Sequence, residues 1–142
     1  MAGVELRSSA RDGHVVVALC GELDVTGAAD AEAAITALAT RGRRLIIDMS
    51  ALDFIDCSSL SVLLRVQGLA LRGGGDVVLA APQPHVLRLL RLTATDEAFW
   101  VHGSVEAAVA GIASRPTRYA ERRLAVSAAS PGRAAPSRTS TG

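Results

Sequence analysis

The sequence lacks long hydrophobic runs and has little cysteine. No apolar stretch approaches the roughly 18 residues needed to cross a bilayer, and no basic and apolar leader precedes the first predicted strand. We therefore expect a cytoplasmic protein with no membrane partner. The two cysteines, Cys20 and Cys57, have none of the spacings of metal sites, and a disulfide between them is not expected in a reducing compartment. We expect free thiols and no cofactor.

Charge is distributed unevenly along the 142 residues. Residues 1–113 hold nine arginines and thirteen acidic residues, whereas 114–142 hold six arginines and one acidic residue, Glu121. The second segment is rich in Ala, Ser, Pro and Arg and has no sustained apolar period, which predicts a basic disordered tail. With one aromatic residue, Tyr119, it shows no recognisable nucleic-acid-reading surface, although a weak contact with acidic protein or nucleic acid stays open. We expect one domain over 1–113 and no nucleic-acid partner.

The beginning of the domain predicts a hairpin followed by a helix. Two β-type runs, Val4–Ser9 and His14–Cys20, flank a segment containing Asp12-Gly13, a dipeptide typical of tight turns. Apolar residues then recur with helical spacing. The residues of this helical pattern are the candidate caps Asp24 and Thr26, the stripe Ala28, Ala31, Ile35 and Leu38, and a stop near Arg41-Gly42.

The rest of the domain alternates between short strands and helices. The unalternated apolar runs Leu45–Ile47 and Val77–Leu79 are typical of strands that are buried on both faces. The alternation predicts an α/β fold, a mixed sheet of four to five strands covered by about four helices. Three later helices are predicted from apolar residues at helical spacing. The first carries Leu60, Leu63, Leu64 and Leu71 and ends before Gly73–Gly75, and the second carries Val86, Leu89 and Leu90 after Pro82 and Pro84. A small strand at Phe99–Val101 precedes the third, which carries Val105, Ala108, Val109 and Ile112.

The segment at the start of the second predicted helix suggests a switch operated by phosphorylation. We expect Asp48 to close a strand, and Asp53 and Asp56 to lie in a short acidic loop. A phosphate on a hydroxyl at the helix start would meet free N–H groups and the positive end of the helix dipole, while Asp53 and Asp56 would repel it. Ser58 could equally be an ordinary N-cap, worth about 1 kcal/mol.

Enzyme chemistry is poorly supported. None of the three histidines, His14, His85 and His102, lies in a motif that would aim it at a nucleophile. Gly73–Gly75 follows a helix and precedes a strand, which is the reverse of a phosphate-binding loop. The aspartates 48, 53 and 56 could suggest a Mg²⁺ site, but they suit a strand end, turns and caps better. We expect neither catalysis nor a bound metal.

Cys57 could be a reactive thiol, because a helix N-terminus can lower a thiol pKa. Asp56 beside it disfavours the thiolate, and Arg65 lies too far along the helix to match the compact loop of thiol phosphatases. We therefore expect Cys57 to be a small, partly buried filler.

Two motifs resemble the STAS domain of bacterial anti-sigma factor antagonists. They are Gly-Glu-Leu-Asp at residues 21–24 and Phe-Ile-Asp-Cys-Ser-Ser-Leu-Ser-Val-Leu-Leu at residues 54–64, and the resemblance spans roughly residues 4–112. It implies a domain that docks onto an anti-sigma factor, commonly a serine kinase, and thereby releases a sigma factor to RNA polymerase. In the family, the kinase reverses this by phosphorylating the antagonist at the start of the second helix.

The second motif departs from the usual family pattern, Asp-Ser-Ser/Thr-Gly followed by Leu and Gly. Cys57 occupies the usual acceptor position and Ser58 that of the second hydroxyl, while Ser59 and Ser61 replace glycines. A serine kinase cannot modify Cys57 in the ordinary way. Either the acceptor has moved to Ser58, or the switch is lost and binding is constitutive.

The resemblance and the local chemistry together predict one partner-binding patch. We expect it to combine the turn at residues 21–24, the loop at 53–58 and the exposed face of the following helix. Two alternatives stay open, a STAS-type ligand-sensing or signalling-assembly module without sigma-factor control, and a thiol-dependent enzyme using Cys57. The expected patch residues are Gly21, Glu22, Asp24, Asp53, Asp56, Cys57, Ser58, Ser59 and Ser61.

Overall fold

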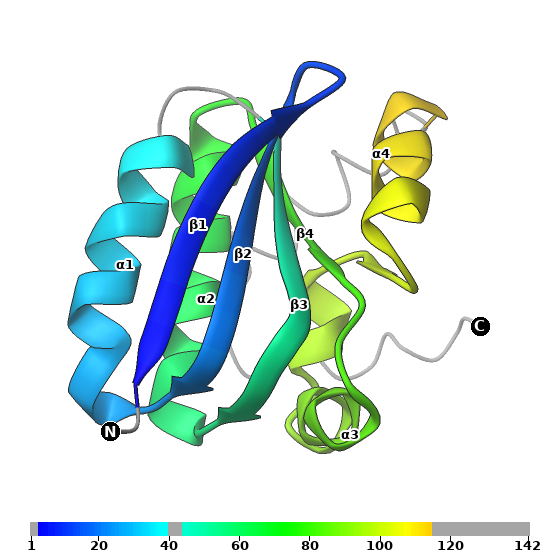
Figure 1. The fold of residues 1–142 in the computed structure, drawn as a ribbon. Coiled ribbons are helices and arrows are strands. Elements are labelled where there is room, and N and C mark those ends of the chain that lie inside the picture. The colour runs from blue at the N-terminus through cyan, green and yellow to red at the C-terminus, as the bar shows by residue number, and fades with distance from the viewer. Residues whose placement is uncertain (1–2, 40–43, 115–142) are drawn as a thin grey trace.

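The fold is taken from a computed structural model, in which residues 3–39 and 44–114 are described (Figure 1). Most of the predicted tail, 115–142, and the predicted helix end at 41–42 lie outside these residues. Within them the strands are β1 (Val4–Arg11), β2 (His14–Leu23), β3 (Arg44–Ile55), β4 (Asp76–Ala80) and β5 (Val101–His102). The helices are α1 (Val25–Ala39), α2 (Cys57–Arg72), α3 (Pro84–Leu92) and α4 (Val105–Ser114), with a 3₁₀ helix, η1 (Thr95–Ala98), before β5.

The five strands form one mixed sheet in the order β1-β2-β3-β4-β5. β1 pairs antiparallel with β2 as the predicted hairpin, and the remaining neighbours are parallel. The hairpin closes through Asp12 and Gly13, which both have positive φ (50° and 83°), the backbone geometry that a two-residue turn of this twist requires. The predicted α/β class, strand number and helix number are confirmed.

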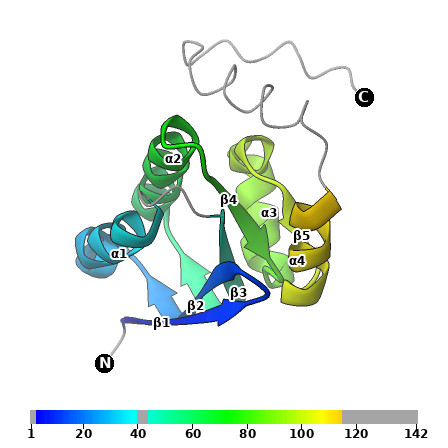
Figure 2. The ribbon, with the colours of Figure 1, turned by 90° about the horizontal axis from the view of Figure 1, so that it is seen from above.

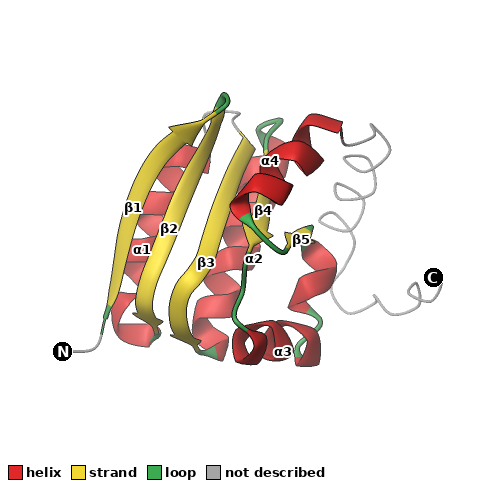
Figure 3. Cartoon of the chain, turned by 45° about the vertical axis from the view of Figure 1, so that its right-hand side comes forward, coloured by secondary structure: helices red, strands yellow, loops and turns green. Residues whose placement is uncertain are grey.

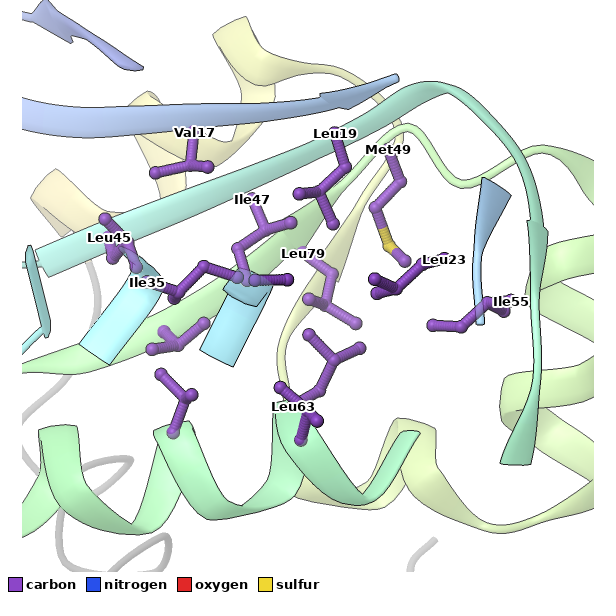
Figure 4. Packing of buried hydrophobic residues seen from close by; sticks show 14 of the residues in the cluster. Val17, Leu19, Leu23, Ile35, Leu45, Ile47, Met49, Ile55, Leu63 and Leu79 are labelled. Carbon is purple, nitrogen blue, oxygen red and sulfur yellow. The ribbon is translucent and has the colours of Figure 1, made fainter. Parts of the chain in front are cut away.

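The two faces of the sheet are covered unequally. Helices α1 and α2 lie side by side on one face, as Figure 2 shows, and α3 extends this layer, whereas α4 covers part of the other face. On the larger side, Ile35 of α1 and Leu63 of α2 meet strand side chains such as Ile47 and Leu79, all fully buried (Figure 4). Because Leu45, Ile46 and Ile47 are buried on both faces, their run shows no alternation, as predicted.

Helix α2 is anchored to the sheet by a buried polar side chain as well as by apolar packing. The amide of Gln67 donates to the carbonyls of Val77 (3.1 Å) and Ala98 (2.9 Å), and its oxygen accepts from the N–H of Val77 (2.9 Å). Buried polar groups are costly unless paired, so these bonds specify the position of α2 along β4.

The prediction that β3 ends at Asp48 is wrong, because the strand continues to Ile55. Its core-facing residues change spacing after Met49, to Leu52 and Ile55, where register shifts between β2 and β3 insert extra residues into β3. These irregularities hide the strand period in the sequence. The expected acidic loop is therefore mostly strand.

The last strand is also displaced from its predicted position at Phe99–Val101. Phe99 is 2% exposed and packs in the main core, and its N–H donates to the carbonyl of Asp96 in η1. Pairing therefore begins later, with Val101 opposite Leu79 and His102 opposite Ala80. Ser114, where we placed the start of the tail, is the last residue of α4.

Of the helices in residues 3–39 and 44–114, none is long and apolar enough to cross a membrane. Figure 3 shows the resulting arrangement, with the long helices α1 and α2 behind the sheet and α4 on its opposite side.

Candidate partner-binding site

The predicted patch lies where two parallel strands end. β2 and β3 run in the same direction, so their carboxyl ends share one edge of the sheet, and each leads directly into a helix. The N–H of Asp56 donates to the carbonyl of Leu23 (3.2 Å), which ties the two strand-to-helix junctions together. The N-termini of α1 and α2 consequently lie next to each other.

Asp56 caps both helices. Its Oδ1 accepts from the N–H of Ser59 (2.9 Å) in the first turn of α2, and its Oδ2 accepts from the N–H of Val25 (3.1 Å) at the start of α1. An N-terminal turn has unpaired N–H groups and a partial positive charge, so a single carboxylate satisfies donors at two positive ends.

These contacts determine the ionisation of Asp56. Partial burial works against the charged form, but hydrogen bonds from Ser59, Ser58 and Val25 outweigh it and hold the pKa of the Asp56 carboxyl below its usual value. Asp56 is therefore a carboxylate at neutral pH.

Ser58 is not the N-cap, which corrects one of our two alternatives. The cap is Asp56, and Ser58 is the second residue of α2. Its side chain is exposed and its hydroxyl donates to Oδ1 of Asp56 (2.9 Å). Because Asp56 already occupies the capping position, the Ser58 hydroxyl stays at the surface, held beside a negative charge.

The neighbours of Ser58 divide between surface and core. Cys57 is exposed, so its expected role as a partly buried filler is wrong, since the first residue of α2 points outward rather than into the core. Ser59 is completely buried and Ser61 is exposed. Both Cys57 and the half-buried Cys20 are free thiols, as expected.

Asp53 lies in strand β3 rather than in a loop, and is held there by α3. The side-chain amide of Gln83 donates to a carboxylate oxygen of Asp53 (3.1 Å) and to the carbonyls of Ser50 (3.1 Å) and Leu52 (3.0 Å). A ring nitrogen of His85 forms a hydrogen bond with the backbone carbonyl of Asp53. Neither residue was expected at the site, since Gln83 went unnoticed and His85 was considered only for catalysis, although their place around Pro84, at the start of a predicted helix, could have pointed to such a role.

The first motif, expected as a turn, is mainly the end of β2. Gly21 and Glu22 are strand residues, and only Asp24 lies between β2 and α1. Gly21 has φ of 103°, and a Cβ there would stand 2.3 Å from the carbonyl oxygen of Gly3, so glycine is required by the backbone. Asp24 accepts from the N–H of Thr26 (3.0 Å), which confirms it as a cap of α1.

A groove of about 410 Å³ runs between α1 and α2, next to Ser58. Ala28 and Ala29 of α1 and Ser58 and Ser61 of α2 line it, and their small side chains leave it open. Further along, Arg65 donates to both carboxylate oxygens of Glu32 at 2.8 Å, linking the two helices. This pair could not be foreseen from the sequence, because it depends on which helices become neighbours.

Large apolar side chains are exposed at the first residue of α1, near the end of β3 and on the eighth residue of α2. Val25 is 72% exposed, Phe54 46% and Leu64 41%. Exposed apolar groups that gather beside polar ones are typical of interaction surfaces. We refer to Val25, Phe54, Cys57, Ser58, Ser61 and Leu64 as the docking surface.

No cluster of three or more His, Cys, Asp or Glu side chains able to hold a metal ion occurs within residues 3–39 and 44–114. Of the aspartates considered for Mg²⁺, Asp56 is engaged with helix N–H groups, Asp53 with Gln83, and Asp48 accepts from the N–H of Ser50 (3.0 Å). These partners are the ordinary ones for caps and strand ends.

A mixed sheet with paired helix starts and an exposed surface around them defines a small α/β domain. The family model of the STAS domain matches residues 6–108. A relative named as an anti-sigma factor antagonist, BtrV of Bordetella bronchiseptica, is 32% identical over 100 residues, which are 70% of this chain and 86% of the relative. The chain belongs to the STAS domain family, which confirms the resemblance.

Solved structures agree with this assignment. An anti-sigma factor antagonist from Mycobacterium paratuberculosis is 26% identical, with a TM-score of 0.72 over 79% of this chain and 96% of that chain. The Bacillus cell fate determinant SpoIIAA in its phosphorylated form has a TM-score of 0.59 at 21% identity, over 78% of this chain and 99% of that chain. At that lower identity, the likeness to SpoIIAA supports the fold alone.

Proposed function

We propose that this protein is a cytoplasmic anti-sigma factor antagonist, which binds an anti-sigma factor with serine-kinase activity and so releases a sigma factor to RNA polymerase. The names of BtrV and of the Mycobacterium paratuberculosis protein support this role, since both are described as anti-sigma factor antagonists. The matching regions cover nearly the whole of both relatives, so the proposal concerns the complete domain.

The observation that carries the proposal is the docking surface. Exposed Val25 and Phe54 offer apolar contact area, and the carboxylates of Asp53 and Asp56 lie close by in the chain. Interfaces commonly combine an apolar centre with a polar rim and bury about 800 Å² on each partner. A surface built on two helix starts and two strand ends is also rigid enough to be recognised without refolding.

The same geometry supports Ser58 as the phosphorylation site. Its hydroxyl is exposed within the docking surface, whereas Cys57 at the usual family position offers no hydroxyl. A phosphate would add about −1.5 to −2 charges. Since Asp56 already lies 2.9 Å from the Ser58 oxygen, the added charge would accumulate at one point of the interface and weaken binding.

We also infer that the protein acts by binding rather than by catalysis. Cys57 has Asp56 as its neighbour in the chain, and the described residues that line the groove beside the docking surface are Glu32, Arg65, serines and aliphatic residues, with no histidine among them. A thiol nucleophile needs a base or a positive environment to ionise near neutral pH.

The test is a binding measurement against the cognate anti-sigma factor, first identified by pull-down and mass spectrometry and then purified. Ser58→Asp should weaken binding at least tenfold, while Ser8→Asp on the exposed edge strand β1 adds the same charge elsewhere and should leave binding unchanged. Equal binding by the Ser58→Asp variant and the wild type would exclude Ser58 as the switch. Failure of the wild type to bind any anti-sigma factor would refute the role itself.

A second candidate, a ligand-sensing module, is favoured by one cavity. It has a volume of about 360 Å³ and lies between α3 and the end of β5, lined by the apolar side chains of Leu87, Phe99 and Val101 and by the polar ones of Arg91, Asp96 and His102 among others. Apolar and aromatic walls with a few polar or charged groups are typical of small-molecule sites. A rise in melting temperature with a screened metabolite or nucleotide, abolished by Arg91→Ala, would support this function.

A further inference from the structure

We propose that Arg65 is the receptor for a phosphate on Ser58, exchanging its present partner Glu32 for the phosphoserine. The inference rests on the proposed phosphorylation of Ser58 and deepens it, because it identifies the element of this chain that would respond to the modification. It follows from the shared position of Ser58, Arg65 and Glu32 in the groove between α1 and α2.

The helix geometry places the two α2 residues on one side. Ser58 and Arg65 are seven positions apart, which is nearly two turns and about 10.5 Å along the axis. Helical side chains lean toward the N-terminus, so the long arginine side chain reaches back toward the first turn of α2. A phosphate on Ser58 extends into the same groove from the opposite end, over small residues such as Ser61 that leave the space open.

The existing ion pair can be exchanged. Arg65 and Glu32 have ideal bidentate geometry, but their side chains are 56% and 28% exposed, and ion pairs in such positions contribute little to stability. A phosphate carries up to twice the charge of a carboxylate and three acceptor oxygens, and guanidinium groups bind it bidentately. Among the described residues that line the groove, Arg65 is the one with a cationic side chain.

The surroundings of Ser58 increase the need for such a partner. Asp56 Oδ1 lies 2.9 Å from the Ser58 hydroxyl oxygen and would repel a phosphate there. The N–H groups of Val25 and Ser59 are already bonded to Asp56 and are not available to the phosphate. A phosphate turned away from Asp56 and toward Arg65 avoids this repulsion.

The chemical step needs ATP bound to the partner kinase. The Ser58 oxygen forms a bond to the γ-phosphorus, the bond from that phosphorus to ADP breaks, and the hydroxyl proton now directed at Asp56 is released. Arg65 then turns to the phosphate, and Glu32 on α1 loses its guanidinium partner. The groove becomes occupied and more negative, so the modification changes the surface of α1 beside the docking surface as well as that of α2.

The experiment installs phosphoserine at position 58 by genetic encoding, which requires neither the kinase nor the anti-sigma factor. A ³¹P NMR titration then measures the second phosphate pKa in the phosphorylated protein and in variants of it. Arg65→Gln should raise this pKa by about 0.2–0.7 unit, the change expected for the loss of one exposed ion pair. Arg72→Gln, which removes an exposed arginine one further heptad along α2, is the matched control and should change it little.

A second variant tests the proposal independently. Glu32→Gln removes the competing carboxylate, so the phosphate pKa should equal or fall below that of the phosphorylated parent. The proposal would be overturned if the phosphate pKa were the same in the Arg65→Gln and Arg72→Gln variants. It would also be overturned if the phosphate pKa in the Glu32→Gln variant rose to the value found in Arg65→Gln. Because the phosphate is installed directly, these results do not depend on whether the anti-sigma factor role is correct.

Discussion

The carboxylate of Asp56 accepts a hydrogen bond from the backbone N–H of Val25, 31 positions earlier in the chain, at 3.1 Å. The same side chain caps its own helix through Ser59 and accepts the hydroxyl of Ser58. One residue thus connects the starts of α1 and α2 and holds the exposed serine of the docking surface. The candidate site and the helix pairing are consequently a single structural unit.

Asp56→Ala should destabilise the domain by about 1–2 kcal/mol, because it removes the cap of α2 and the acceptor for Val25 together. Asp30→Ala, at an exposed position within α1, should stay within about 0.5 kcal/mol of the wild type. Urea unfolding followed by circular dichroism measures both. Equal stability of the two variants would contradict the double-capping role.

The lowered pKa of Asp56 predicts a specific pH dependence. A carboxyl with a folded-state pKa below its unfolded value of about 3.9 contributes stability above that value and loses it as the pH falls through the folded-state pKa. Asp56→Asn keeps a capping oxygen without the charge. The wild type should therefore be the more stable at pH 7, and the difference in unfolding free energy, measured in urea titrations, should shrink steadily as the pH falls below about 4.

Other groups do not obscure this comparison. Glu32 and Glu106 also have lowered pKa values, because Arg65 and Arg11 donate hydrogen bonds to them. Their protonation in acid lowers the stability of the wild type and of Asp56→Asn equally. If the difference in unfolding free energy between wild type and Asp56→Asn stayed constant over the whole pH range, the charge of Asp56 would not contribute to stability.

Gly21→Ala should destabilise the protein by about 1–3 kcal/mol. The residue has φ of 103°, and the new Cβ would overlap the Gly3 carbonyl oxygen, which accepts a 2.9 Å bond from the N–H of Glu22. Gly27→Ala is the matched control, because Gly27 is helical and its Cβ would touch only the side chain of Val4 at 3.4 Å. That variant should be unchanged or more stable by up to about 1 kcal/mol, as thermal unfolding would show.

Phe54→Ala should weaken binding to the anti-sigma factor about tenfold or more without loss of fold, since exposed aromatic residues often dominate interface energies. Leu92→Ala truncates an apolar side chain that is 74% exposed at the end of α3 and is not part of the docking surface, and this variant should bind as the wild type does. Isothermal titration calorimetry distinguishes the two. If the Phe54→Ala variant bound with full affinity, the interface would not include Phe54 and would lie elsewhere on the domain.

Much of the fold could be predicted because its signals are local. The turn at Asp12-Gly13, the helical spacing of Ala28, Ala31 and Ile35, and the unalternated run 45–47 each report their own element. The length of β3 could not be predicted, because register shifts against β2 break the period between Met49 and Leu52. The predicted tail lies outside the described residues and stays a prediction.

For the site, the sequence by itself determined that an acidic residue, a thiol and hydroxyl groups occur together at the start of a helix. The tertiary structure decided their roles. It made Asp56 rather than Ser58 the cap, turned Cys57 outward, buried Ser59, and placed Glu32 opposite Arg65. The physical reason is that a side chain's partners depend on which strand ends and helix starts become neighbours, and the parallel pairing of β2 with β3 sets this over a separation of some thirty residues.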